Sequence, residues 1–525
     1  MSAAARTRWT AHAIRLAWLL PGLLALLVSY ALLRFLLLPV LPGLGPEVAA
    51  SRAQGPALWP AALNSLRLAT LAAAGAVLPA VWLGLMLERR AWRGRGVLAL
   101  ALWLLFLLPG YLAAAGWQIV LGLPALRAAP WLRDALLGWP GLAGLSVLRG
   151  LPVATLAARA GWSQCPARIE DAMRVHVRGR LRRALPAVAP MLPFAAAAFL
   201  IVFVETVQEY GLATTLGARL RLPLLSTEIY ASLANWPISW VRAARAGDLL
   251  VLVALLPALL RPLLPRAVPT RAGPRAVATH PASRAGQAGG WAAAVVLLAL
   301  GGAVPLLALA AGLASPEAAA LPDGAAHALL ASALYGFVAS LLALCLACAL
   351  VARPPSSRLA AVLGWLPMVN MAVPGIVLGA AVVIAFNAPP LPLTGTPLAL
   401  LLAETATQLP VLALLLGGSL RAGGGVAGEA ARVHGLALAV RIERIHLPPL
   451  VRPLAWAWSL AFCRLFFELP LSQMLAPAGG EPVGVVLVQL QQSLRLAAEA
   501  RLAVLALLLC GAVVAAVLFL ARARR

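Results

Sequence analysis

Long apolar stretches constrain this chain more than any other feature. Several exceed the about 20 residues that an α-helix needs to cross a bilayer. Hydrophobic residues make up 62% of the 525 residues and charged residues only 11%, whereas a soluble protein would carry about 25% charged residues. Ala and Leu dominate these stretches and strand-like alternation is absent, which favours helices over a membrane barrel. The sequence therefore predicts an all-α membrane protein.

Twelve transmembrane helices are expected, six in each half of the chain. They lie near residues 14–39, 61–87, 97–122, 141–159, 187–208, 247–264, 291–313, 326–352, 359–386, 398–420, 450–470 and 502–520. Because six is even, both halves enter the membrane in the same sense, so a repeat of the halves would be parallel. The predicted organisation is a first half (1–264), a flexible cytoplasmic linker rich in Pro, Gly and Arg (265–290), and a second half (291–525).

The positive charge indicates an orientation. The formal charge is +25, and the chain contains Arg but no Lys. With the N terminus in the cytoplasm, most arginines fall in segments on the inner side, as the positive-inside rule requires. Both termini are therefore predicted to be cytoplasmic. This distribution between spans also argues against nucleic-acid binding, the other common role of a basic chain.

Two stretches, 259 residues apart, carry a common signature. The second contains Glu429, Ala430, Ala431 and Gly435 and then Ile445-His446-Leu447-Pro448, and the first contains Glu170, Asp171 and Ala172, with His176 where the glycine would fall. The same offset matches Pro190 with Pro449 and Glu209 with Glu468. These matches indicate a duplicated chain, and the Arg distribution puts both stretches in the cytoplasm.

This signature resembles the cytoplasmic EAA loop of permease subunits in binding-protein-dependent ABC importers. The resemblance implies a fused permease with type I importer architecture, a degenerate EAA loop at 168–190 and a second EAA loop at 427–449. In that family the loop forms a short helix that docks into a cleft of the ATPase. Ala430, Ala431 and Gly435 would share one side of that helix and allow close approach, and Glu429 suits its N-terminal dipole. An amphipathic interfacial helix without a partner is the alternative.

The resemblance also implies partners. They are a cytoplasmic ABC ATPase in two copies and a periplasmic substrate-binding protein, with the chain in the bacterial inner membrane. A phosphate-binding G-x-x-x-x-G-K-[ST] loop cannot occur without Lys, so ATP hydrolysis must come from the partner ATPase and the chain itself is not expected to be an enzyme. No cofactor and no metal site are expected. Cys345 and Cys348 are interpreted as small buried hydrophobes in an apolar helix.

Ionisable residues near the outer ends of the fifth and eleventh spans are candidates for a translocation pathway. They are Glu205, Glu209, Tyr210, Arg464 and Glu468. Charged side chains at membrane depth usually face a bundle interior or a water-filled path. The 259-residue offset relates Glu205 to Arg464, and Glu468 follows Arg464 by one helical turn, so a Glu205–Arg464–Glu468 network is predicted.

Two Pro-Gly pairs are expected to break or kink their spans at corresponding positions of the halves. They are Pro109-Gly110 in the third span and Pro374-Gly375 in the ninth. Paired breaks of this kind often mark a transport pathway, although a kink used only for packing is the alternative.

The segments around these acids resemble the fused permeases for ferric iron. The sequence thus predicts a permease subunit that moves ferric iron from a periplasmic binding protein into the cytoplasm by alternating access. Thiamine, phosphonate or polyamine are alternative substrates within the same importer class. An ion-coupled secondary transporter is the alternative of another class, since it would also have two parallel halves. A membrane enzyme is disfavoured because the H-E-x-x-H and G-x-S-x-G motifs are absent.

Overall fold

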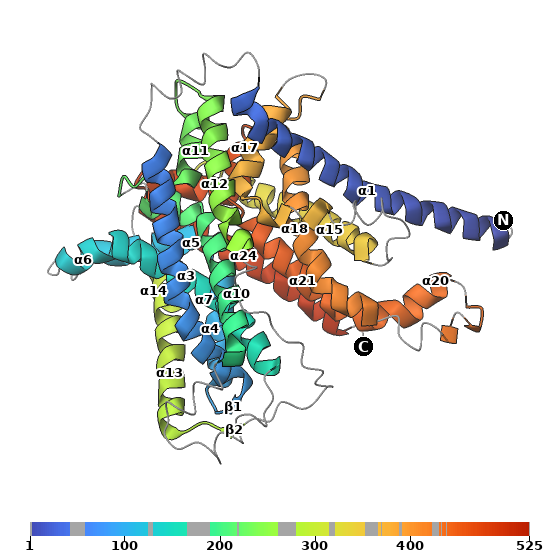
Figure 1. Ribbon diagram of the computed structural model, residues 1–525, viewed down its shortest axis with the longest axis horizontal. Coiled ribbons are helices and arrows are strands. Elements are labelled where there is room, and N and C mark those ends of the chain that lie inside the picture. Colours follow the sequence, from blue (N-terminus) through green and yellow to red (C-terminus); the bar gives the residue numbers. More distant parts are fainter. Residues whose placement is uncertain are drawn as a thin grey trace.

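The computed structural model describes residues 3–41, 58–123, 130–164, 189–217, 220–260, 280–313, 321–351, 366–368, 370–387, 391–422, 430–431, 433–436 and 438–523. These residues are almost entirely helical (Figure 1), which confirms the predicted all-α class. The helices before residue 265 are α1 (Ala3–Leu37), α3 (Leu58–Glu88), α4 (Arg95–Leu107), α5 (Gly110–Gly122), α6 (Pro130–Leu136), α7 (Trp139–Gln164), α10 (Leu192–Val207), α11 (Leu225–Ala234) and α12 (Trp240–Leu260). The later helices are α13 (Arg284–Leu298), α14 (Val304–Gly312), α15 (Ala325–Val351), α17 (Gly375–Ala385), α18 (Pro397–Ala422), α20 (Leu438–Arg441), α21 (Leu447–Phe466), α22 (Pro470–Leu475), α23 (Val483–Gln492) and α24 (Leu496–Ala523).

Short π-helical and 3-10 turns complete the helical structure. The π turns are η4 (Ala213–Gly217), η6 (Ala299–Ala303) and η9 (Ile442–His446), and the 3-10 turns are η1 (Leu38–Val40), η3 (Ala189–Met191) and η8 (Asn370–Ala372). Within the described ranges, strand structure is limited to β1 (Arg90–Ala91) and β2 (His280–Pro281), which pair in parallel. The architecture is therefore set by helix packing.

Seven of these helical segments have the length and hydropathy of a membrane span, or nine if each of two bent pairs counts as one span. The seven lie on α1, α3, α7, α13 with α14, α15, α18 and α24. The bent pairs are α4 with α5, and residues 366–372 with α17. Helices α10, α12 and α21 occupy the places of the other three predicted spans and are not among the nine. The chain is thus a multi-pass helical membrane protein, and the number twelve stays a prediction.

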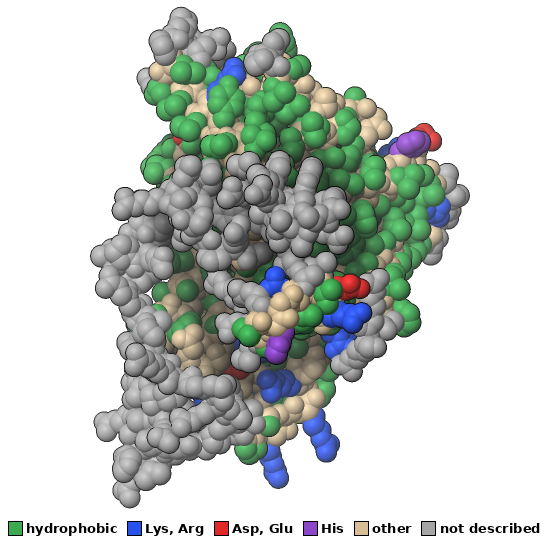
Figure 2. Space-filling model, turned by 90° about the vertical axis from the view of Figure 1, so that its right-hand side faces the viewer, with side chains coloured by type: hydrophobic (Ala, Val, Ile, Leu, Met, Phe, Trp, Pro, Cys, Tyr) green, Lys and Arg blue, Asp and Glu red, His purple; other side chains and the backbone are tan. Residues whose placement is uncertain are grey.

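The outward faces of these helices are apolar. On α1, the side chains of Leu20, Leu23, Leu26 and Leu33 are each more than half exposed, whereas Phe35 is fully buried. Figure 2 shows a broad hydrophobic surface over much of one side of the molecule. A soluble monomer rarely exposes contiguous apolar area on this scale, so this surface is suited to contact with lipid tails.

Small residues let the helices approach closely in the interior. Along α3, which packs against α7 and α10, Ala69, Ala72, Ala73 and Ala76 have no exposed surface. A Cβ built on Gly75 of α3 would lie 2.7 Å from a methyl carbon of Val147 on α7. Membrane helices lack a strong hydrophobic drive to associate, so such close contact supplies van der Waals attraction instead.

Gly116 makes one close contact between helices testable. A Cβ at Gly116 on α5 would lie 2.4 Å from the carbonyl oxygen of Pro305 on α14, whereas a Cβ at Gly122 on the same helix would meet nothing within 4 Å. Gly116→Ala should therefore lower the free energy of unfolding by about 1–3 kcal/mol, the usual effect of overpacking. Gly122→Ala should not. Thermal unfolding of the two variants in lipid nanodiscs would measure the difference, and equal midpoints would contradict the packing.

The first helix of each predicted half packs against helices of the other half. Helix α1 contacts α15, α17 and α18, and α13 contacts α3 and α4. Figure 1 shows α1 lying beside α15 and α18, with α13 beside α4 on the other side of the molecule. Helix α14 in turn contacts α5. The N-terminal and C-terminal parts of the chain are therefore interlocked, and neither forms a separate bundle.

Several elements recur at nearly the spacing of the sequence repeat. Helices α7 and α18 have 26 residues each and begin at residues 139 and 397, a separation of 258. Helices α11 and α23 have 10 residues each and begin at residues 225 and 483, again 258 apart. These two pairs of elements therefore repeat in length at nearly the offset of the sequence signature.

The C-terminal part of the predicted flexible linker (265–290) contains a strand and the start of a helix. Residues 280–290 are structured, because β2 pairs with β1 and α13 begins at Arg284. The hydroxyl of Ser283 accepts a hydrogen bond from the backbone N–H of Gly286 (3.1 Å) and so caps the helix. Residues 265–279 lie outside the described ranges.

Candidate functional site

A cavity of about 650 Å³ lies where the two bent helix pairs meet. Its polar lining residues are Ser146, Arg149, Glu205, Thr206, Gln208, Glu209, Tyr111, Tyr210, Asn370, Thr407, Gln408, Arg464 and Glu468. All five residues predicted for the pathway are in this set. The sequence therefore identified residues from both halves of the chain that the fold brings together around one space.

Many residues that line the cavity form pairs that are 259 residues apart in the sequence. Nine pairs of lining residues stand at that spacing: Tyr111 and Asn370, Arg149 and Gln408, Val204 and Cys463, Glu205 and Arg464, Gln208 and Phe467, Glu209 and Glu468, Tyr210 and Leu469, Gly211 and Pro470, Leu212 and Leu471. Such a set is expected if the two halves of a repeat contribute the same structural positions to a space between them. The cavity thus lies between repeat-related surfaces.

Both predicted Pro-Gly breaks occur, and both lie at the cavity. The axes of α4 and α5 form an angle of 101°, and that between residues 366–372 and α17 is 118°. Pro109 and Pro374 are extended (ψ 142° and 137°) and stand immediately before the new helices. A proline has no N–H to continue the preceding helix but suits the start of the next one. Gly110 and Gly375 line the cavity.

Glu209 and Glu468 make the same local hydrogen bond. Oε1 of Glu209 accepts from the backbone N–H of Leu212 (3.2 Å), and Oε1 of Glu468 accepts from the backbone N–H of Leu471 (2.7 Å). Oε2 of Glu468 also accepts from the N–H and the hydroxyl of Ser472, at 2.8 and 2.9 Å. The first N–H groups of a helix have no intrahelical acceptor, so these carboxylates stabilise the helical turns that follow them.

Arg149 is a site residue that the sequence analysis missed. Its Nη2 lies 2.9 Å from Oε2 of Glu209, and its Nη1 donates to the carbonyl oxygen of Leu108 (3.3 Å) at the bend between α4 and α5. An arginine in the middle of a predicted span was a usable signal, because charges at that depth usually serve a function. Its repeat-related counterpart, Gln408, carries no charge.

Glu205 and Arg464 face the cavity without a direct partner. Both side chains are exposed, and both line the cavity. Among the residues that the structure describes, neither makes a hydrogen bond or an ion pair within 4.0 Å, although each lies near enough to be influenced by the charge of the other. The predicted contact of Arg464 with Glu468 is not seen in this part of the chain, since Glu468 binds the first turn of α22.

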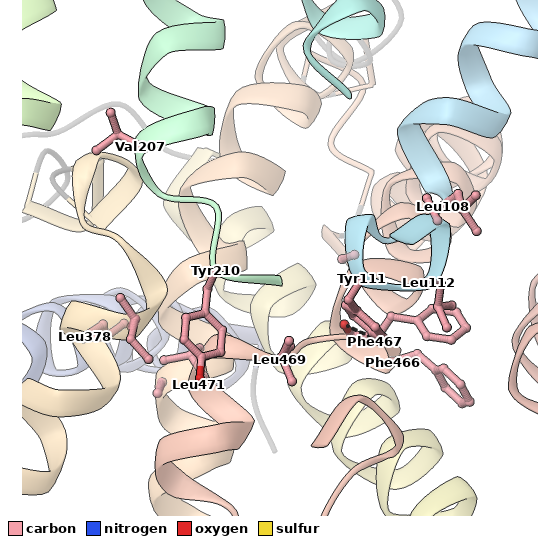
Figure 3. Packing of buried hydrophobic residues seen from close by; sticks show 14 of the residues in the cluster. Leu108, Tyr111, Leu112, Val207, Tyr210, Leu378, Phe466, Phe467, Leu469 and Leu471 are labelled. Atoms are coloured by element: carbon pink, nitrogen blue, oxygen red, sulfur yellow. Dashed lines mark hydrogen bonds between the residues drawn. The ribbon is translucent and has the colours of Figure 1, made fainter. Parts of the chain in front are cut away.

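Tyr210 lies in the wall of the cavity and is nearly buried. Figure 3 shows its ring pointing toward Leu471 and Leu378, and its centroid lies 6.0 Å from that of Tyr230. Near it, the hydroxyl of Tyr111 donates to the carbonyl oxygen of Phe467 (3.3 Å, Figure 3). This hydrogen bond joins the bend of the N-terminal part to the segment after α21.

Glu404 is a second residue that the sequence analysis missed. It lies on α18 one turn before Gln408, is 1% exposed, and its Oε2 has no hydrogen-bond partner among the described residues. Oε1 of Gln408 is likewise unpartnered. Glu404 lies close enough to interact with the charge of Glu468. Of Glu404 and Gln408, only Gln408 lines the cavity.

Most of the predicted ATPase-coupling residues lie outside the described ranges. These are Glu170, Asp171, Ala172, His176 and Glu429. Of the others, Ala430 is exposed and Ala431 is buried, and the backbone N–H of His434 donates to the carbonyl oxygen of Ala430 (2.9 Å). Ala430 and Ala431 thus belong to a helical turn, as predicted.

Gly435 does not share a helical face with these alanines. Its φ is +69°, in the left-handed region, and the N–H of Leu436 donates to the carbonyl oxygen of Ala431 (3.0 Å). This pattern is a Schellman motif, in which a glycine ends the helix. The predicted small-residue face is therefore wrong for Gly435, whose conformation, together with its size, explains the glycine.

The segment around Gly435 presents an accessible surface. The side chain of Val433 is 85% exposed and that of Leu436 is 43% exposed, while no atom lies within 4 Å of a Cβ built on Gly435. Figure 1 shows α20 and its neighbours projecting from the helical body, and Figure 2 shows basic, acidic and His side chains gathered at this end. Exposed Glu443 and Arg444 belong to the same segment. The segment is therefore accessible at the surface and carries both apolar and charged side chains.

Across the described part of the chain, no three His, Cys, Asp or Glu side chains are grouped to hold a metal ion. Comparison of the chain with family models, curated proteins and solved structures gave no match.

Proposed function

We propose that this chain is the membrane permease subunit of an ABC importer, with both transmembrane halves in one polypeptide. Each half would contribute six spans, and both termini and both loops with the EAA signature would lie in the cytoplasm. The observation that carries the proposal is the second loop. It combines the sequence signature with a short helical turn, a glycine C-cap and exposed apolar side chains at the tip of a projecting segment.

The cavity supplies the second line of support. Repeat-related residues surround it, and both helix breaks open onto it. In parallel repeats, a binding site commonly lies between the repeats, at discontinuous helices. We therefore assign the cavity as the translocation pathway. Rocking of one repeat against the other would open it alternately to the two sides of the membrane.

The proposed energy source is a pair of cytoplasmic ATPase subunits that engage the two loops. A periplasmic binding protein would deliver the substrate to the outer mouth of the cavity. Ferric iron, the substrate suggested by the sequence resemblance, stays a prediction. Polyamine, thiamine and phosphonate fit the same importer class.

Reconstitution tests the proposal directly. The chain would be purified in nanodiscs together with a candidate ABC ATPase and a candidate substrate-binding protein, and ATP hydrolysis would be measured with and without loaded binding protein. We expect a stable complex and an increase of hydrolysis by the loaded binding protein. A chain that binds no ATPase and transports solute with an ion gradient alone would instead be a secondary transporter.

A further inference from the structure

Glu205 and Arg464 give the cavity one free negative and one free positive side chain. They occupy the same position of the two repeats, at the C-terminal ends of α10 and α21. Both are exposed to the cavity, and neither has a hydrogen bond or an ion pair in the described residues. A charge at membrane depth without a partner is costly, so such residues usually serve a ligand or a pathway.

The remaining charges of the lining are already engaged. Glu209 is paired with Arg149, and Glu468 accepts hydrogen bonds from Leu471 and Ser472. A ligand that enters the cavity would therefore find two side chains without a hydrogen bond or ion pair among the described residues, one of each sign. A guanidinium binds carboxylate or phosphate oxygens through a planar pair of N–H groups, and a carboxylate binds an organic cation.

Size limits the ligand further. A cavity of about 650 Å³ falls within the range of roughly 300–1,000 Å³ found for sites that hold small organic molecules. It is much larger than a bare metal ion requires, and in the described part of the chain no cluster of metal ligands is present. The space and the two free charges fit a molecule with an anionic end and a cationic end.

We propose that the cavity takes a zwitterionic organic solute, with its anionic oxygen group at Arg464 and its cationic group at Glu205. This inference rests on the proposed function only in treating the cavity as the pathway. It names the substrate class and excludes a free ferric ion, a polyamine or a simple dianion as the preferred ligand. The anionic group can be a carboxylate or a phosphate, which the probes below distinguish.

The test is equilibrium binding to the full chain in nanodiscs with defined probes. The zwitterions are γ-aminobutyrate, glycine betaine and phosphoethanolamine, and the comparison ligands are putrescine, succinate and ferric citrate. Wild type should bind at least one zwitterion roughly tenfold more tightly than each comparison ligand, a difference of about 1.4 kcal/mol. Arg464→Glu should shift the preference to putrescine, and Glu205→Arg should shift it to succinate.

The double variant and the neutral variants show whether a loss of binding comes from the lost charge or from misfolding. Glu205→Arg combined with Arg464→Glu should regain zwitterion binding, because the ligand can reverse its orientation. Glu205→Gln and Arg464→Gln should each weaken zwitterion binding without creating a new preference. Leu414→Ala, an exposed position of α18 outside the cavity lining, should leave the preference unchanged.

Three outcomes would overturn the inference. They are a wild type that binds none of the three zwitterions, a wild type that prefers ferric citrate or putrescine, and single charge reversals that leave the preference unchanged. None of these would affect the ATPase stimulation that tests the proposed function. Conversely, a selective cavity in a chain that binds no ATPase would retain the inference and remove the importer.

Discussion

Gly435→Arg is expected to abolish substrate uptake and the stimulation of ATP hydrolysis by loaded binding protein, with the chain still folded in the membrane. Gly435 has a φ of +69° and ends the helical turn that begins at Ala430. A side-chain-bearing residue in this conformation costs about 1–2 kcal/mol. Arginine would also add a bulky charge to the proposed docking surface. Uptake and stimulated hydrolysis are the measurements.

Two further substitutions separate backbone conformation from bulk. Gly435→Asn should retain most activity, because Asn tolerates the left-handed region. Gly435→Ala adds strain without bulk, since nothing lies within 4 Å of its Cβ, and should give an intermediate loss. His176→Gly in the first loop should be tolerated. Near-normal uptake by Gly435→Arg would remove the second loop from the coupling mechanism.

Glu209→Ala combined with Glu468→Ala should lower uptake by at least about tenfold while the complex with the ATPase still assembles. Each carboxylate holds the turn that lines the cavity, through one backbone hydrogen bond at Glu209 and three hydrogen bonds at Glu468. The net stabilisation from a single hydrogen bond is about 0.5–1.5 kcal/mol, and hydrogen bonds to charged groups exceed this. The change also leaves Arg149 without its ion-pair partner.

Glu481→Ala is the matched control for the double variant. Glu481 also accepts a backbone hydrogen bond, from Gly479 (3.2 Å), but it does not line the cavity. Its uptake kinetics should be close to those of wild type. Unchanged uptake in the double variant, or an equal loss in the control, would count against the cavity as the pathway.

The sequence predicted the structure best where the physical requirement involves only residues that are neighbours in the chain. Apolar length predicted the membrane helices, and the Pro-Gly pairs predicted the breaks before α5 and α17 because a proline cannot continue a helix. The five residues predicted for the pathway were chosen because ionisable groups are rare at membrane depth and because the repeat offset pairs four of them, Glu205 with Arg464 and Glu209 with Glu468. Tertiary structure then brought all five to one cavity, which no local pattern required.

The errors have equally specific causes. The predicted linker includes the start of α13 because its Pro, Gly and Arg content is typical of a loop. The Ser283 cap that begins this helix was not recognised. Gly435 was assigned to a helical face because its spacing from Ala431 fits a helix, whereas its actual φ can be known only from the backbone. Arg149 and Glu404 were single charges in apolar spans, and the partners and burial that make them notable are tertiary properties.

Accessibility of the cavity from the two membrane faces tests the account most directly. A Gln408→Cys variant, with the five native cysteines replaced by serine, would be reconstituted with the ATPase and treated with a membrane-impermeant thiol reagent from either face. We expect labelling from one face without nucleotide and from the opposite face when ATP and vanadate trap the ATPase. Labelling from the same face in both states, or labelling that does not depend on the ATPase, would contradict this expectation.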